Sequence, residues 1–365
     1  MTNQRIVTFG ELLLRFSKPD HLRLTQGDMF TSKYGGSEAN VAVSLATLGD
    51  EVDYVSRLPE TPVGQAGVQS LQALGVGCRH VLFGGRRIGT YYMEPPAGMR
   101  PPKVIYDRDG SAYSELQPGM IPWRDILRGA SVLHVSGITA AISQQAADAT
   151  FEALDVADDM GVKISFDINY RKNLWRYGAD PRETISRMLA RCDMMFGDAI
   201  EFEWLFQRKQ PPFTATDSNF TMQTEEYREW FEDIHRQFPR CQDWLMGMRN
   251  MVASNHHTLT ALLYSVSRKE EGERRKEEEA TLYEAPILDI PDVVDPVGVG
   301  DAFMAGLLHA SRIFPDDKQL QLNYSLAASA LKNTVPGDFN LSTHEEIMEV
   351  VNHARDTHSL YKVTI

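Results

Sequence analysis

The sequence predicts an α/β protein with a mostly parallel central sheet and helices on both faces of that sheet. Short β-branched, apolar runs alternate with longer helical patterns through most of the 365 residues. The hydrophobic share of the chain, 42%, is large enough to bury a sizeable core. Proteins of this class bind ligands at the carboxyl ends of their parallel strands, so functional residues are expected in the loops that follow those strands.

The alternation can be followed element by element. Strands are expected at residues 5–10, 51–58, 131–137, 162–169, 192–198 and 243–248, where apolar runs are short. Helices are expected at residues 37–49, 63–75, 143–161 and 181–192, where apolar residues recur at helical spacing. Gly49 and Gly75 follow the first two helices in the position of a C-terminal cap.

Two stretches interrupt this order. Residues 11–34 and 88–117 lack helical periodicity and carry short aromatic and β-branched runs divided by Pro and Gly. They predict a small antiparallel sheet that acts as a lid over a single domain spanning residues 1–365. Residues 207–225 and 268–280 are polar or highly charged, and we interpret them as surface insertions without a function of their own.

Composition excludes several classes of protein. Lys and Arg number 37 against 50 Asp and Glu, and the net charge of -13 disfavours nucleic-acid binding. The three cysteines are far apart and form no C-x-x-C pair, so we expect neither a disulfide framework nor a zinc site. No apolar run has the length of a signal sequence or a membrane span, and a cytoplasmic protein without membrane contacts is expected.

The segment "DPVGVGDAFM", residues 295–304, carries the strongest sign of chemistry. Gly298 and Gly300 form a turn at the start of an apolar helix, where free backbone N–H groups attract an anion. Phe303 stands where the dinucleotide fingerprint requires a third glycine, and the Lys-Ser/Thr pair of a P-loop is missing. Asp301 fits either a general base for phosphoryl transfer or an ordinary acidic residue in a first helical turn.

Two motifs resemble a known family. "DPVGVGDAF" is similar to the C-terminal signature of ribokinase-like (PfkB-type) carbohydrate kinases, and "YGGSEANVAVSLATLG" is similar to their N-terminal signature. The resemblance implies a three-layer α/β/α sandwich and a kinase that uses ATP and Mg²⁺, and it leaves a requirement for a monovalent cation such as K⁺ open. It also implies that Asp301 is the catalytic base and that Gly298, Val299 and Gly300 form an anion hole.

Within this family the chain is most similar to 2-keto-3-deoxygluconate kinases. The resemblance implies contacts with the sugar from Gly35, Gly36, Tyr91, Tyr106, Arg108, Arg171 and Asp301. Two arginines suit a sugar acid, because the planar guanidinium binds a carboxylate through paired, charge-assisted hydrogen bonds. Taken alone, the tyrosines also fit packing positions and the arginines also fit surface ion pairs.

The resemblance assigns a metal and a nucleotide site as well. Asp198 and Glu201 correspond to the family's Asn-x-x-Glu motif, which helps to place Mg²⁺ through water, with Asp in place of Asn. Acidic residues also start helices. Nucleotide contacts are implied for Gly247, Arg249, Gly298, Gly300 and Asn333. The Gly-x-x-Gly turn that usually follows the strand at 243–248 in this family is missing, which leaves the contacts of the ATP phosphates open.

The sequence therefore predicts ATP-dependent phosphorylation of 2-keto-3-deoxygluconate to its 6-phosphate. Alternatives are a kinase of 2-keto-3-deoxygalactonate, of fructose or of ribose, and a sugar-binding protein that has lost catalysis. An NAD-dependent oxidoreductase ranks last because the third glycine is absent. The expected partners are the sugar acid, ATP and further copies of the chain, joined through the lid.

Overall fold

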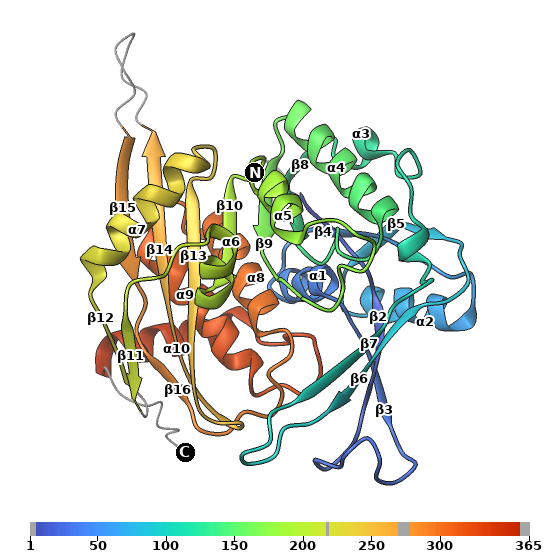
Figure 1. Cartoon of the computed structure of the whole chain (residues 1–365), viewed down its shortest axis with the longest axis horizontal. Helices are drawn as coiled ribbons and strands as arrows, with labels where there is room; N and C mark the ends of the chain where they lie inside the picture. Colours follow the sequence, from blue (N-terminus) through green and yellow to red (C-terminus); the bar gives the residue numbers. More distant parts are fainter. Residues whose placement is uncertain (1–4, 217–218, 269–277, 358–365) are drawn as a thin grey trace.

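A central sheet of mostly parallel strands forms the middle of the molecule (Figure 1). The computed structural model describes residues 5–216, 219–268 and 278–357. Within them the sheet has the order β15-β14-β13-β10-β9-β8-β1-β4-β5, with β16 paired to β14, and all pairs from β13 to β5 are parallel. The strands are β1 (Arg5–Phe9), β4 (Val52–Leu58), β5 (Gly77–Phe83), β8 (Ala130–Ser136), β9 (Lys163–Asp167), β10 (Met194–Asp198), β13 (Asp243–Ala253), β14 (His256–Arg268), β15 (Glu278–Glu284) and β16 (Leu288–Ile290).

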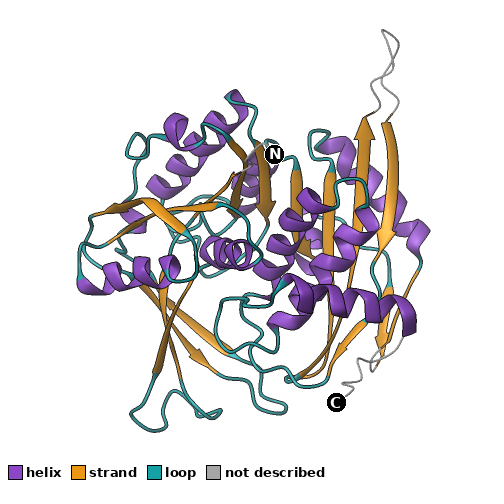
Figure 2. Ribbon diagram, turned by 180° about the vertical axis from the view of Figure 1, so that it is seen from behind, coloured by secondary structure: helices purple, strands orange, loops and turns teal. Residues whose placement is uncertain are grey.

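Helices cover both faces of this sheet (Figures 1 and 2). Alternate strand residues are buried against one helical layer or the other. In β1, Val7 and Phe9 face one layer and Ile6 faces the other, as the two-residue repeat of a strand requires. This arrangement confirms the predicted three-layer α/β fold. One layer holds α3 (Trp123–Ile126), α4 (Gln144–Asp159), α5 (Pro181–Leu189), α6 (Ala199–Phe206) and α7 (Thr224–Gln237); the other holds α1 (Ser37–Thr47), α2 (Pro62–Gln72), α8 (Val299–Ile313) and α9 (Lys318–Lys332), with α10 (His344–Thr357) packed on α9.

A second, four-stranded sheet projects from the core (Figure 2). Its order is β3 (Thr31–Gly35), β2 (Leu13–Ser17), β6 (Gly89–Glu94), β7 (Lys103–Asp107). The sequence predicted an antiparallel sheet, but the central pair β2–β6 is parallel. The two hairpins β2–β3 and β6–β7 leave the core in the same direction and meet through their first strands, so that pair runs parallel.

The end of the predicted lid lies in the core instead. After β7 a short 3₁₀ helix at Tyr113–Glu115 leads back to the main body, and Tyr113 and Leu116 are buried in its apolar core. The Tyr113 ring contacts Phe9 of β1, and alternating polarity could not distinguish Tyr113 and Leu116 from strand residues of the lid. That the four-stranded sheet moves as a lid stays a prediction.

The two predicted insertions differ in the structure. Residues 207–225 contain a hairpin of β11 (Phe213–Thr216) and β12 (Asn219–Met222), and Phe213, Phe220 and Met222 pack against the core. The other insertion, 268–280, falls largely on residues 269–277, which lie outside the described chain. No helix in the described ranges is long and apolar enough to cross a membrane.

Candidate active site

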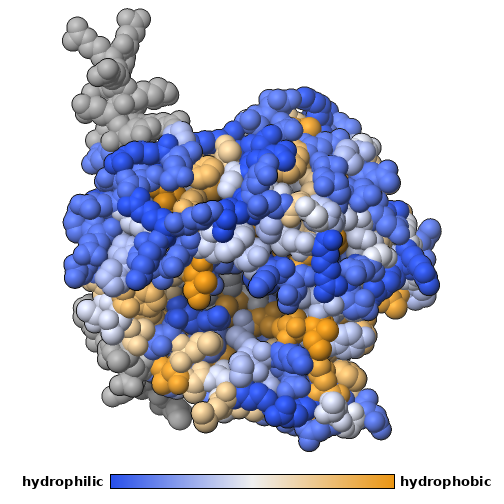
Figure 3. Space-filling model, in the orientation of Figure 1, coloured by the Kyte–Doolittle hydropathy of each residue, from blue (hydrophilic) through white to orange (hydrophobic). Residues whose placement is uncertain are grey.

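A cavity of about 470 Å³ opens between the four-stranded sheet and the N-terminus of α8. Figure 3 shows this face of the molecule hollowed, with hydrophobic side chains around the hollow. Gly35 and Asn333 do not line the cavity. It brings together most of the predicted site residues, namely Gly36, Tyr91, Tyr106, Arg108, Arg171, Asp198, Glu201, Gly247, Arg249, Gly298, Val299, Gly300 and Asp301.

Gly298 starts helix α8 in the left-handed region, with φ of 84°. A Cβ atom there would lie 2.1 Å from the carbonyl oxygen of Asp338, so both the backbone angle and the close approach require glycine. No side chain caps the N-terminus of α8. The first backbone N–H groups of the helix therefore remain available to an anion in the cavity.

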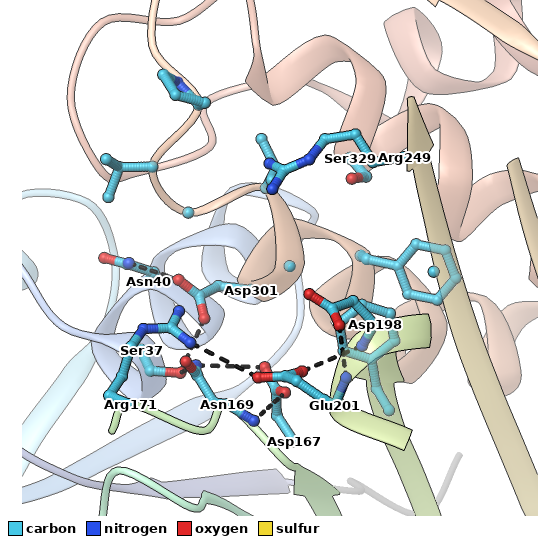
Figure 4. A pocket seen from close by; sticks show the side chains of 18 of the residues that line it. Ser37, Asn40, Asp167, Asn169, Arg171, Asp198, Glu201, Arg249, Asp301 and Ser329 are labelled. Carbon is cyan, nitrogen blue, oxygen red and sulfur yellow. Dashed lines mark hydrogen bonds and ion pairs between the residues drawn. The ribbon is translucent and has the colours of Figure 1, made fainter. Parts of the chain in front are cut away.

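Asp301 lies in the first turn of α8 and is 7% exposed (Figure 4). Its carboxylate accepts hydrogen bonds from Ser37 Oγ at 2.8 Å and from Asn40 Nδ2 at 2.7 Å, both on α1. Burial raises the pKa of Asp301, and the hydrogen bonds from Asn40 and Ser37 offset part of that rise. A carboxylate that is oriented in this way and has a raised pKa suits proton abstraction from a hydroxyl.

The two glycines before α1 have different positions. Gly36 caps α1 and lines the cavity, and a Cβ atom on it would lie 2.2 Å from the carbonyl oxygen of Glu11. Gly35 instead packs against Asp338, whose Oδ2 would lie 2.2 Å from an added Cβ. Gly35 thus makes room for a buried carboxylate and does not face the cavity.

Asp338 belongs to a buried cluster that sequence reasoning missed. The Tyr91 hydroxyl donates a hydrogen bond to the Asp338 carboxylate, so this predicted sugar ligand already has a partner. Arg15, from β2 of the small sheet, donates to Asp338 Oδ1 at 2.8 Å and to Asp295 Oδ2 at 2.8 Å. One guanidinium therefore joins two carboxylates of the core to the small sheet. Removing one partner of such a buried pair costs about 3 to 5 kcal/mol.

Arg108 is also paired. Its guanidinium lies 2.6 Å from Glu11 Oε2, and the two side chains are 4% and 2% exposed. Its charge is thus largely balanced before any substrate binds. The other oxygen, Glu11 Oε1, has no hydrogen-bond partner among the described residues, although it is buried beside the cavity. We expect that oxygen to accept a hydrogen bond from a substrate hydroxyl.

Arg171 is the more accessible of the two predicted carboxylate ligands. Its side chain is 43% exposed, and its guanidinium lies 3.6 Å from Glu201 Oε1 and 2.9 Å from the Tyr170 carbonyl oxygen. Figure 4 shows it next to Asp301. Tyr106 also lines the cavity and interacts with the Arg171 side chain. This end of the cavity can therefore bind an anionic group close to the candidate base.

Asp198 and Glu201 form a capping box at the start of α6. Glu201 N donates to Asp198 Oδ1 at 2.8 Å and Asp198 N donates to Glu201 Oε2 at 3.1 Å. Burial, followed by repulsion from Asp198, raises the pKa of Glu201 to about 7. The pKa of Asp167 is also raised, first by burial and then by repulsion from Glu201 and Asp301. Asp198 and Glu201 thus do cap the start of α6. The concentration of carboxylates at this point is also compatible with a bound divalent cation.

The carboxylates of Asp198 and Glu201 suit a Mg²⁺ ion that substrate phosphates also help to hold. Among the described residues, no group of three or more His, Cys, Asp or Glu side chains could hold a metal ion alone. Mg²⁺ is often bound by one or two carboxylates together with water and substrate phosphates. Asp198 and Glu201 are the residues that would hold it here, directly or through water, and the ion would neutralise phosphate charge.

The opposite end of the cavity is more apolar. Arg249 and Ser329 lie together there (Figure 4), and Leu259 and Leu326 line the wall. β13 does not end at residue 248 as expected but continues to Ala253 and forms a hairpin with β14, which explains the missing turn after the strand. Asn333 lies behind this wall, where its side chain donates to the Ser329 carbonyl oxygen at 3.0 Å.

Several site residues were missed although their pattern held a signal. Ser37 and Asn40 lie in the first turn of α1. Asp167 is the last residue of β9 and Asn169 follows it, at the carboxyl end of a strand where ligands bind in this fold. Polar side chains at those positions could have been predicted. Arg15 and Asp338 could not, because 323 residues separate two side chains that are in contact.

The fold and the cavity together define an α/β enzyme with an uncapped helix N-terminus beside a buried carboxylate. The chain belongs to the pfkB family of carbohydrate kinases, whose family model matches residues 3–238. It is 28% identical to a 2-dehydro-3-deoxygalactonokinase of Haloferax volcanii over 95% of this chain and 96% of that protein. It is 32% identical to a 2-dehydro-3-deoxygluconokinase of Bacillus subtilis, over 56% of this chain and 63% of that protein. The crystal structure of a 2-dehydro-3-deoxygluconokinase from Thermotoga maritima matches 96% of this chain and 99% of that one, with a TM-score of 0.83 and 32% identity.

Proposed function

We propose that this carbohydrate kinase transfers the γ-phosphoryl group of ATP to the 6-hydroxyl of 2-keto-3-deoxygluconate. The observation that carries the proposal is the position of Arg171 beside Asp301. The Arg171 guanidinium can bind the sugar carboxylate in the same cavity that holds the candidate base. The galacto epimer is the second candidate, since the relative matched along nearly the whole chain is named a 2-dehydro-3-deoxygalactonokinase.

Each part of the cavity has a role in this proposal. Asp301 removes the proton of the sugar hydroxyl, while Ser37 and Asn40 hold its carboxylate in position. The N–H groups at Gly298–Asp301 stabilise the negative charge of the transferred group. Arg249 and the apolar wall near Ser329 receive the nucleotide, so the donor and acceptor meet at the start of α8.

A panel assay tests this function. We would measure ADP release from ATP and Mg²⁺ with 2-keto-3-deoxygluconate, 2-keto-3-deoxygalactonate, gluconate, fructose and ribose. The proposal expects the two keto-deoxy acids to have the highest kcat/KM, and the ratio between them identifies the preferred epimer. Higher kcat/KM for fructose or ribose would overturn the acid-sugar assignment while leaving the kinase class intact.

Glu201→Gln is expected to raise the Mg²⁺ concentration that gives half-maximal turnover by about 10- to 100-fold, the typical loss when a residue supporting a metal site is removed. The amide keeps an oxygen acceptor for Tyr170 N, now at 2.7 Å, but it no longer offers a negative charge to the cation. Magnesium titrations of the initial rate measure the effect.

Glu203→Gln is the matched control, because Glu203 lies on the same helix and is exposed. It should leave the magnesium titration unchanged. An equal shift in both variants, or none in Glu201→Gln, would remove Glu201 from the metal site and leave it as a helix cap only.

We also propose that the chain forms a homo-oligomer through the four-stranded sheet. Large apolar side chains are exposed at Met29 and Phe30, in the loop before β3, and at Val104 and Ile105 on β7. Light scattering of the wild type and of a Phe30→Ser, Ile105→Ser double variant tests this, and an unchanged mass would contradict it.

A further inference from the structure

Lys332, the last residue of α9, carries a buried side chain that the proposed reaction does not use. It is 0% exposed, and its Nζ donates to two backbone carbonyl oxygens, that of Asp295 at 3.2 Å and that of Val335 at 3.0 Å. Burying an ammonium costs free energy that hydrogen bonds and nearby opposite charges only offset, and an apolar side chain of similar volume avoids that cost. Its position therefore calls for an explanation.

The ammonium lies where two loops meet behind the anion-binding turn. A Cβ atom on Gly298 would be 3.4 Å from Lys332 Cε, which shows how closely the side chain packs under that turn. Asn333 O accepts hydrogen bonds from Val294 N at 2.8 Å and Asp295 N at 3.2 Å, and Asp295 Oδ2 accepts one from Gly337 N at 2.9 Å. Segments 294–298 and 332–338 are thus joined, and the ammonium lies between a carbonyl group of each.

We propose that the Lys332 ammonium is a built-in monovalent cation that holds the Gly298–Asp301 turn in its anion-binding conformation, so that this kinase turns over without free K⁺. Lys332 touches neither substrate and is a positioning residue. An ammonium group and K⁺ are similar in size and both bind carbonyl oxygens, so a tethered ammonium can replace a diffusible ion. The inference requires only ATP-dependent turnover of some sugar, not the particular substrate proposed above.

The charged groups around Lys332 are consistent with this role. Asp295 and Asp338 are on the two joined segments, Asp301 is on α8, and Arg15 comes from β2. Burial lowers the pKa of Lys332 to about 8, while Asp295 and Asp338 oppose that change. The cation is therefore present at neutral pH and is lost as the pH rises above about 8.

The first test measures turnover in buffers whose only monovalent cation is choline, with and without added K⁺. The wild type should have the same kcat in both. Lys332→Met should lower kcat by about 10- to 100-fold, as expected for loss of a residue that supports the reacting groups, with little change in KM for the sugar. Lys332→Ala should regain part of its kcat with K⁺ or NH₄⁺ but none with tetramethylammonium, which is too large for the vacated space.

The pH profile separates this role from a merely structural one. Wild-type kcat should fall as the pH rises through about 8, and Lys332→Met should lack that decline. The contribution of Lys332 to stability should change in the opposite direction: between about 8 and the ordinary value of 10.5 the unfolded chain binds more protons at this site, so the free energy of unfolding of the wild type should rise with pH relative to that of Lys332→Met. A decline in turnover over the pH range in which Lys332 becomes less costly to the fold cannot come from unfolding caused by Lys332.

Lys318→Met is the matched control, since Lys318 begins the same helix and pairs with Asp243 at 2.7 Å, away from the cavity. It should leave kcat and the pH profile unchanged. If both Lys332 variants fail to fold, the wild type still decides the question through its cation dependence and alkaline decline. A wild type that requires K⁺, or a folded Lys332→Met enzyme with unchanged kcat, would overturn the proposal.

Discussion

Replacing Asp301 with Asn is expected to lower kcat by roughly a hundredfold to ten-thousandfold, the usual contribution of a positioned general base. The fold should tolerate the change, because the amide oxygen can accept from Asn40 and the amide nitrogen can donate to Ser37 Oγ. Binding of sugar and nucleotide, measured by calorimetry, should be nearly unchanged. The loss would then belong to the chemical step.

The acid side of the pH profile gives a second readout for Asp301. A base must be ionised, and burial raises the pKa of Asp301, so wild-type kcat should fall on acidification at a higher pH than for an ordinary Asp. At saturating Mg²⁺, which favours the ionised form of Glu201, Asp301→Asn should lack that decline. Asp316→Asn, an exposed carboxylate just beyond the same helix, serves as the control. Near-normal turnover in Asp301→Asn would remove the catalytic assignment.

Replacing Arg171 with Ala is expected to reduce kcat/KM for 2-keto-3-deoxygluconate by about 2 to 4 kcal/mol in transition-state free energy, because the sugar carboxylate then lacks its cation. Activity on fructose, which has no carboxylate, should fall much less. Arg171→Lys keeps the charge but loses the planar pair of donors, so it should restore only part of the activity. Steady-state kinetics with both sugars measure the difference.

Arg176→Ala is the matched control for Arg171, since Arg176 follows in the same loop, is 68% exposed and lies 3.7 Å from Asp109. It should affect neither sugar. Arg108 is unsuitable for this test, because its removal leaves Glu11 charged, buried and without its partner. Equal losses with both sugars in Arg171→Ala would show that Arg171 serves the nucleotide or the fold, and the acid-sugar proposal would fail.

The sequence was sufficient for those features that depend on short segments. The apolar repeats of β1, α1, β4 and α2 predicted the alternating fold, because a period of two or of 3.6 residues can be read within one element. The turn at Gly298 and Gly300 predicted an anion site for the same reason. The glycine, its positive φ angle and the uncapped backbone N–H groups of α8 all belong to one short segment of the chain.

Contacts between distant segments were decided only by the tertiary structure. The sequence contained Arg108 and Tyr91 as candidate sugar ligands, but folding pairs Arg108 with Glu11 and Tyr91 with Asp338. Whether a charged side chain is free for a ligand depends on which opposite charge is buried beside it, and that partner lies 97 residues away for Arg108.

The burial of Lys332 was likewise decided only by the tertiary structure. In the sequence it is an ordinary lysine near a helix end, where cations are common and usually exposed. Only the meeting of segments 294–298 and 332–338 buries it against two carbonyl groups under the anion-binding turn. Local pattern thus determined which elements form and where an anion can bind. The packing of remote loops decided which charges remain free to act, because desolvation and pairing depend on neighbours in space.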